Sequence, residues 1–368
     1  MKAPRFTLFF VVLLSLGFSR VSAQKKVGFD KLENRNGTYY YNGSTFTGMS
    51  ILLYDNKRMW QQVEWSNGKI HGWYKSWYET GREDQQVEYK NGKRHGSYHT
   101  WHDNGKDEVV CTYSEGKLDG VFNEYYKSGV PKRQVSYTMG KKNGPMKLWF
   151  PNGVVEQEAN FKDGVPHGKV VSYTQINTKR KEVNYVNGLR DGASFIYHSS
   201  GRVGEETNYK QGYMHGKKIV YDASSNKLSE QTYNMGKLDG ISIKYAPPVG
   251  NSPIGFKLEE ANYQGGKLHG EYTRWKDAKI DMKGSYSEGL KTGEWIENAS
   301  QDGTKSHGSY VDGKKHGPWV LGNSRLFGKM EGSFHMGLKD QKWTIYNHKG
   351  KKIRVENWDK GELINVVD

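Results

Sequence analysis

Apolar and polar residues alternate along this chain in short runs that end at glycines. In most runs a polar residue directly precedes an aromatic one, and the second residue before the aromatic is often apolar, as in Val63, Val87, Cys111, Val135, Ala159 and Val183. An alternation with a period of two is typical of a half-buried β-strand. Each run is therefore predicted to be a strand with one packed and one solvated face.

The aromatic residues recur at a nearly constant spacing, each followed three residues later by a glycine. We call them the leading aromatics: Trp65, Tyr89, Tyr113, Tyr137, Phe161, Tyr185, Tyr209, Tyr233, Tyr263, Tyr286, Tyr310, Phe334 and Trp358. A second glycine, here called the ladder glycine, comes four residues after nearly every first one: Gly48, Gly72, Gly96, Gly120, Gly144, Gly168, Gly192, Gly216, Gly240, Gly270, Gly293 and Gly317, with Gln341 in the last place. The period is 24 residues over most of the chain. A fixed period of this length indicates a tandem repeat array.

Each repeat is predicted to be one β-hairpin, because two polar glycine-containing stretches separate two extended runs. Asn-Gly pairs, which favour tight hairpin turns, occur at Asn67-Gly68, Asn91-Gly92, Asn104-Gly105, Asn152-Gly153 and Asn187-Gly188. Helices are rejected, since two or three glycines per repeat would each cost about 1 kcal/mol in a helix interior. The predicted fold is all-β: an elongated, open antiparallel β-meander of about thirteen tandem hairpin repeats.

Further aromatics follow the ladder glycines in two sets. One set stands two residues after the glycine (Tyr74, Tyr98 and Phe122), and the other stands five after it (Trp77, Trp101, Tyr125, Trp149, Tyr173, Tyr197, Tyr221, Tyr245 and Trp275). An offset of three residues puts the two sets on opposite faces of the sheet unless a β-bulge intervenes. The sequence leaves this choice open.

The chain divides into four predicted segments. Residues 1–23 resemble a signal peptide, with Lys2 and Arg5 before an apolar run and a small-residue cleavage pattern at Ala23. Residues 24–48 are predicted to be an N-terminal cap and first partial repeat, 49–337 the repeat array, and 338–368 a C-terminal capping repeat. A proline-containing insertion at 246–255 interrupts the array. The mature protein is expected to be exported to the periplasm or the extracellular space.

The recurring residues GKxHG, YxxxW and YxNGK resemble the MORN-repeat families, and most closely the bacterial 24-residue variant labelled YwqK-like antitoxin. The resemblance covers essentially all of the mature chain. It implies an open sheet of hairpins in which Gly72, Gly96, Gly120, Gly144, Gly168, Gly192, Gly216 and Gly240, with Tyr89, Tyr113, Tyr137, Tyr185, Tyr209 and Tyr233, define the repeat. Other MORN arrays bind lipid headgroups, act as protein scaffolds or accompany enzymes, and the label adds an antitoxin-like partner of a toxin as an alternative.

No residue constellation indicates catalysis, a metal or a cofactor, so a non-enzymatic protein is expected. Histidine precedes the ladder glycine at His71, His95, His167, His215, His269 and His316. Equivalent positions in adjacent repeats lie about 10 Å apart, too far for one zinc ion. Aspartate, asparagine or threonine fill the same position in other repeats, which indicates a hydrogen bond to the turn backbone. The single cysteine, Cys111, is predicted to be a buried thiol.

The charge is strongly positive, at +15, and it stays at +12 without Lys2, Arg5 and Arg20 of the signal segment. Lysine follows the turn glycine in many repeats, which predicts a row of cations along one sheet edge: Lys69, Lys93, Lys117, Lys141, Lys237, Lys267 and Lys314. Such a row favours anionic lipid headgroups or acidic polysaccharide, although lysine also keeps wet turns soluble. Nucleic acid is an unlikely partner for an exported protein.

The repeat array and the lysine row favour two functions. The first is an exported scaffold that binds another protein through its repeat surface, and the second is a binder of anionic lipid headgroups or envelope polysaccharide. Open sheet edges also favour end-to-end self-association.

Overall fold

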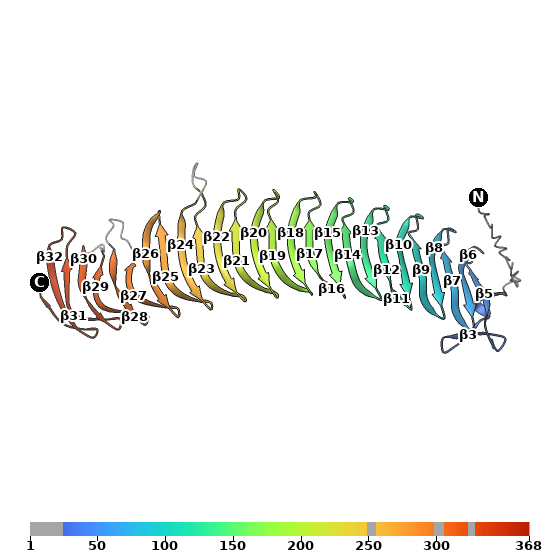
Figure 1. Cartoon of the computed structure of the whole chain (residues 1–368), viewed down its shortest axis with the longest axis horizontal. Coiled ribbons are helices and arrows are strands. Elements are labelled where there is room, and N and C mark those ends of the chain that lie inside the picture. Colours follow the sequence, from blue (N-terminus) through green and yellow to red (C-terminus); the bar gives the residue numbers. More distant parts are fainter. Residues whose placement is uncertain (1–24, 249–254, 298–304, 323–327, 368) are drawn as a thin grey trace, which may run out of the picture. The chain divides into compact units, whose positions relative to one another are not determined.

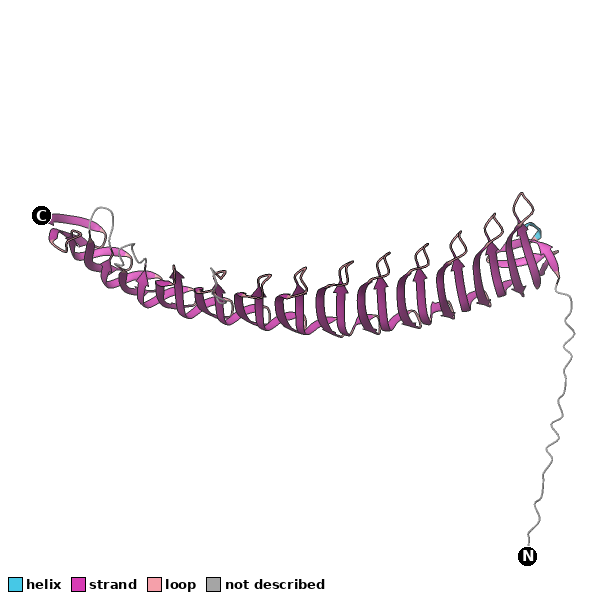
Figure 2. Ribbon diagram, turned by 90° about the horizontal axis from the view of Figure 1, so that it is seen from above, coloured by secondary structure: helices cyan, strands magenta, loops and turns pink. Residues whose placement is uncertain are grey.

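The computed structural model describes residues 25–248, 255–297, 305–322 and 328–367, so the predicted signal segment and most of the 246–255 insertion lie outside the described residues. The chain forms two compact units, Met1–Gly129 and Val130–Asp368. Most of the described residues are in strands (Figure 1, Figure 2). No helix in this part of the chain has the length and apolar character needed to span a bilayer.

The first unit begins with a short parallel pairing, followed by a small separate sheet. Strand β1 pairs parallel with β5, while β2, β3 and β4 form a three-stranded antiparallel sheet. Phe46, Val63 and Trp65 are buried there, with Tyr39 packed 4.4 Å from the ring of Trp65. The elements are β1 (Lys26–Gly28), η1 (Phe29–Lys31), β2 (Glu33–Arg35), β3 (Thr38–Tyr41), β4 (Ser44–Thr45), β5 (Gly48–Leu53), β6 (Met59–Ser66), β7 (Lys69–Trp77), β8 (Glu83–Lys90), β9 (Lys93–Trp101), β10 (Asp107–Ser114), β11 (Lys117–Leu118) and β12 (Gly120–Tyr125).

The second unit consists of antiparallel strands, each paired with its neighbours in the chain. They are β13 (Pro131–Thr138), β14 (Lys141–Trp149), β15 (Val155–Lys162), β16 (Val165–Pro166), β17 (Gly168–Tyr173), β18 (Lys179–Val186), β19 (Leu189–Tyr197), β20 (Val203–Lys210), β21 (Tyr213–Tyr221), β22 (Lys227–Asn234), β23 (Lys237–Tyr245), β24 (Lys257–Gln264), β25 (Lys267–Lys276), β26 (Lys279–Ser287), β27 (Leu290–Glu297), β28 (Ser306–Val311), β29 (Lys314–Leu321), β30 (Lys329–His335), β31 (Leu338–Tyr346), β32 (Lys352–Asp359) and β33 (Glu362–Val367). The predicted all-β, open antiparallel meander of hairpins is confirmed.

The predicted tight turns form at three of the five Asn-Gly pairs. At Asn67-Gly68, Asn91-Gly92 and Asn187-Gly188 both central residues have positive φ, as a type I′ turn requires. Turns of another type form at Asn104-Gly105 and Asn152-Gly153, where only the glycine has positive φ and its N–H donates to His102 O at 2.8 Å and Phe150 O at 2.9 Å, respectively. These two pairs lie in the wider loops at the opposite ends of the strands. There the asparagine amide donates to a carbonyl of the next loop, Lys127 O at 2.8 Å for Asn104 and Gln175 O at 3.0 Å for Asn152.

The packed face of the strands follows the predicted alternation. Val63, Val87, Cys111, Val135, Ala159 and Val183 are all buried. Burial of Cys111 is as predicted, and it raises the pKa of the thiol to about 11, so the group is protonated at neutral pH. We call this side of each unit the packed face and the other side the polar face.

The two aromatic sets lie on opposite faces. In β7, Ser76 pairs with Gln85 and Trp77 with Glu83, so the extra residue of the bulge, Asp84, belongs to β8. The alternation within β7 is therefore unbroken between Tyr74 and Trp77. Because the bulge adds its residue to the neighbouring strand, Tyr74 stays on the packed face and Trp77 on the polar face.

Candidate functional site

The ladder glycines mark a bulge in the second strand of each hairpin. Their φ angles are positive, for example 97° at Gly72 and 92° at Gly192. In several repeats the polar residue before the leading aromatic binds the backbone that the bulge leaves free: Glu64 accepts the N–H of Trp73 at 3.0 Å, and the Asn184 amide donates to Ala193 O at 2.7 Å. The polar residue is thus a cap for the bulge and not only a solvated side chain.

We expect Gly192→Ala to destabilise the second unit by about 1–2 kcal/mol, because a side chain at positive φ is strained. Backbone strain is the only expected cost at this position, because an added Cβ would meet no clash: its nearest neighbouring atom is 3.7 Å away, an ordinary contact. Gly192→Asn should cost less, because asparagine tolerates this conformation. Urea denaturation compares the two variants, and equal losses would show that φ is not the cause.

The leading tyrosines are half-buried, and two of them pack against an arginine of the preceding strand. The guanidinium of Arg94 lies 5.4 Å from the centre of the Tyr113 ring, and that of Arg190 lies 5.2 Å from Tyr209. Tyr89, Tyr113, Tyr137, Tyr185, Tyr209 and Tyr233 all have intermediate exposure. These residues form the packing of the repeat.

Most of the histidines bond to the turn of the following repeat, as the sequence predicts. The Nδ1 atoms of His71, His167, His269 and His316 accept turn N–H groups at 3.4–3.5 Å. Asp191 occupies the histidine position of its repeat and likewise accepts a turn N–H, that of Gln211, at 3.1 Å. His95 and His215 are exceptions, since their Nδ1 atoms have no hydrogen-bond partner. Within the described residues, no group of three or more histidine, cysteine, aspartate or glutamate side chains is arranged to hold a metal.

Within each unit the turn lysines lie at equivalent turns, and in the second unit their series is interrupted. Lys69 donates to Gly37 O at 2.9 Å, and Lys93 and Lys267 form ion pairs with Glu115 and Glu288. For Lys117, Lys141, Lys237 and Lys314 no ion pair is found within the described chain, and all four are exposed. Between Lys141 and Lys237 the same position holds apolar residues, so the cations do not run without a break.

Together with Val186 and Met235 of neighbouring turns, these apolar residues form an exposed stripe on the tight-turn edge of the second unit. Its members are Val165, Val186, Leu189, Tyr213 and Met235, which are 41–57% exposed. Each position is next to the following turn: a Cβ added to Gly188 would lie 3.3 Å from Val165, and one added to Gly212 would lie 3.7 Å from Leu189. We call this set the apolar turn stripe. In the sequence it lies where three successive repeats lack the turn lysine, whereas Leu290 and Leu338 replace that lysine in single repeats further along the chain.

Ion pairs repeat along the polar face of the second unit. Glu182, only 6% exposed, lies 2.5 Å from Lys169 and 3.0 Å from Lys179, and Glu230 lies 2.7 Å from Lys217 and 2.8 Å from Lys227. Hydrogen bonds from these lysines hold the pKa of both carboxyl groups below its ordinary value. Here the charges neutralise one another.

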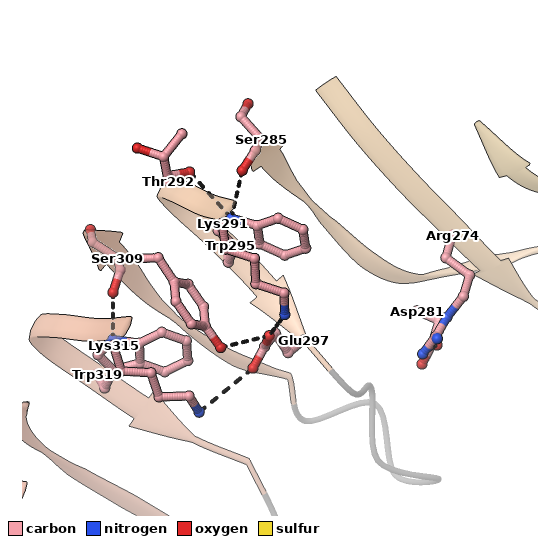
Figure 3. Close-up of polar contacts among 11 residues, drawn as sticks. Arg274, Asp281, Ser285, Lys291, Thr292, Trp295, Glu297, Ser309, Lys315 and Trp319 are labelled. Carbon is pink, nitrogen blue, oxygen red and sulfur yellow. Dashed lines mark hydrogen bonds and ion pairs between the residues drawn. The ribbon is translucent and has the colours of Figure 1, made fainter. Parts of the chain in front are cut away.

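A different cluster lies on the packed face between β27 and β29. The buried Glu297 carboxylate contacts the Lys291 ammonium, accepts the Tyr310 hydroxyl at 2.9 Å and lies 3.6 Å from Lys315 (Figure 3). The two ammonium groups also lie over tryptophan rings, Lys291 at 4.2 Å from the centre of Trp295 and Lys315 at 4.0 Å from that of Trp319. The two lysine ammonium groups thus occupy the faces of the tryptophan rings, and the cluster connects the three adjacent strands β27, β28 and β29.

Two hollows open on the polar face of the second unit. One, of about 410 Å³, includes Lys147, Glu158 and Lys169, whose charges are already paired within the protein. The other, of about 550 Å³, lies over β25 to β28, and its lining is Glu271, Lys283, Gly284, Ser285, Glu294, Trp295, Ile296, Lys305 and His307. We call the second one the β25–β28 hollow.

Comparison with known proteins gives no family assignment. No protein-family model matches the chain, and no curated protein is significantly similar to it, so the MORN resemblance stays a prediction. Among solved structures, the chain is similar to one titled "Crystal Structure of TcdB2-TccC3", at 8% identity over 85% of this chain and a TM-score of 0.16. A second, "Crystal Structure of TcdB2-TccC3-Cdc42", has 11% identity over 88% of this chain and a TM-score of 0.14. The chain spans 19% and 23% of these two proteins.

Proposed function

We propose that the protein is an exported, non-enzymatic scaffold of the MORN-repeat type that binds another protein through the tight-turn edge of its second unit. The observation that carries this proposal is the apolar turn stripe. Leucine, tyrosine, methionine and valine side chains on successive turns leave about half of their surface open to solvent. An exposed apolar patch with a polar rim is typical of a protein-binding site.

The charges around the apolar turn stripe indicate the charge expected on the partner's surface. Lys141 precedes the stripe, Lys237 follows it, and both are exposed and without an ion pair in the described chain. Lys162 and Lys210, on two turns of the stripe itself, are exposed too. A partner with an apolar centre and an acidic rim is complementary to this surface.

We expect Leu189→Lys to weaken partner binding at least tenfold, because it places a charge in the centre of the apolar contact. A photo-crosslinking residue at position 213 identifies the partner in cells, and the affinity of the purified pair is then measured. Ile196→Lys is the matched control, since Ile196 is 44% exposed against 52% for Leu189 but lies at the other end of the same strand. Equal effects of the two variants would refute the assignment of this edge.

Anionic lipid or envelope polysaccharide is the second candidate, favoured by the four exposed lysines that lack ion pairs. Cosedimentation of the chain with neutral and anionic vesicles at low and high salt tests it. Binding to anionic vesicles alone, lost at high salt and on replacing Lys117, Lys141, Lys237 and Lys314 with glutamine, would favour this candidate over a protein partner. End-to-end self-association is a separate proposal, and a single mass over a wide concentration range would exclude it.

A further inference from the structure

We propose that the β25–β28 hollow binds a small zwitterion, such as a short peptide with free amino and carboxyl ends. This site is independent of the tight-turn edge. It takes its character from a reversal of charge that occurs only in the repeats around β25 to β28.

The reversal affects two positions on the polar face. The third residue before the leading aromatic is glutamate in five successive repeats: Glu158, Glu182, Glu206, Glu230 and Glu260. In the next two repeats the same position holds Lys283 and His307. The residue after the ladder glycine alternates between lysine and an apolar residue in the preceding four repeats (Lys169, Ala193, Lys217 and Ile241) and is then Glu271 and Glu294 in the next two.

The reversed charges do not pair as those of the earlier repeats do. Lys169 and Lys217 approach Glu182 and Glu230 to 2.5 and 2.7 Å. For Lys283, Lys305, Glu271 and Glu294, no ion pair is found among the described residues, and the hollow of about 550 Å³ lies between them. This volume is in the range of small-molecule sites, roughly 300–1,000 Å³.

The strand register separates the charges into two rows. Lys283 and His307 both pair with Ile296, which puts these three side chains in one row across β26, β27 and β28. Glu271 pairs with Ser285 and Glu294 with Ser309, which places the carboxylates two residues further along the strands. Two residues of extended chain span about 7 Å. The hollow thus has a basic end and an acidic end.

The floor between the rows is largely uncharged. Gly284 contributes no side chain, Ile296 is half-buried, and Trp295 lies beneath with 1% exposure. A dipeptide with free ends fits this arrangement, because its terminal charges are about 7 Å apart when it is extended. Its carboxylate would lie at Lys283, Lys305 and His307, and its ammonium group at Glu271 and Glu294.

Titration of the purified full chain with glycylglycine, followed by calorimetry and by the His307 ring NMR signals, tests the site. We expect saturable binding that shifts these signals, and binding about tenfold weaker for N-acetylglycylglycine and for glycylglycinamide, since each lacks one terminal charge. Lys283→Gln and Glu271→Gln should each weaken glycylglycine binding by a similar factor.

Lys147→Gln, in the hollow whose charges are paired, is the matched control and should leave the affinity unchanged. Equal binding of the blocked and free peptides would overturn the proposal. The absence of any saturable binding by the folded chain, or unchanged affinity in both the Lys283→Gln and Glu271→Gln variants, would also overturn it.

Discussion

Replacing Trp319 with alanine should destabilise the second unit by about 3–5 kcal/mol, the usual cost of removing a buried tryptophan side chain. Trp319 is 2% exposed, and its indole N–H donates to Ser309 O at 3.0 Å. It meets Tyr310 edge-to-face at 5.3 Å between ring centres. The substitution removes these contacts together and takes the ring from beneath the Lys315 ammonium.

The backbone around Trp319 shows that the cavity would not collapse easily. A Cβ added to Gly308 would lie 2.4 Å from the Trp319 ring, so the indole already packs directly on the main chain. The same arrangement recurs at Gly284 with Trp295 and at Gly332 with Trp343. Because the neighbouring strand has no side chain that can move in, most of the volume of the indole should remain empty.

Urea denaturation followed by far-ultraviolet circular dichroism measures the loss. Trp60→Ala is the control, because Trp60 is 46% exposed, and it should change the stability by no more than about 0.5 kcal/mol. A Trp319→Ala loss as small as that of Trp60→Ala would contradict the packing described here. The loss of stability for Trp319→Phe should lie between those of Trp319→Ala and Trp60→Ala, because phenylalanine keeps an apolar ring but leaves Ser309 O without its indole donor.

The hairpin repeats could be predicted from the sequence because each signal for them is local. Turn glycines, alternating strand residues and the 24-residue period act within a few residues of one another, and Val63, Val87 and Val135 are buried as expected. The Asn-Gly pairs at 104 and 152 form turns of another type, and each asparagine amide donates to a carbonyl of a loop one repeat away. Local turn preference cannot reveal that partner.

The surfaces could be predicted only in part. The lysine positions were found, but the apolar turn stripe appears only when the repeats that lack lysine are compared with those that have it. Two further features are visible in the sequence. Glycine stands at 284, 308 and 332, where several earlier repeats have valine, and tryptophan stands two residues after the ladder position in these repeats. Their meaning depends on cross-strand register, which pairs Trp319 with Gly308 on one side and Gly332 on the other.

Replacing Glu297 with alanine should cost on the order of 3 kcal/mol at pH 7, because it leaves cations without their counter-charge in a partly buried site. Lys291 and Lys315 have side chains that are only 22% and 27% exposed, against 10% for Glu297. The Tyr310 hydroxyl also loses its acceptor. Burial lowers the pKa of Lys315 even with Glu297 present, and removal of the carboxylate should lower that pKa further.

The contribution of Glu297 should disappear in acid. Burial alone would raise the pKa of this carboxyl group, but the Lys291 ammonium, the Tyr310 hydroxyl and the charge of Lys315 together hold it below the ordinary 4.5. The unfolded chain therefore takes up the proton first as the pH falls. Stability from this group is complete above about pH 4.5 and is lost as the pH drops through the folded-state pKa.

Denaturant midpoints of the wild type, Glu297→Gln and Glu297→Ala at pH 7 and pH 3 test this assignment. Glu297→Gln keeps an acceptor for the Tyr310 hydroxyl and should lose less than Glu297→Ala at pH 7. The gap between the wild type and Glu297→Gln should narrow at pH 3, since both side chains are then closer to neutral. A gap that stays constant between the two pH values would mean that the shape of the side chain, and not its charge, holds these three strands together.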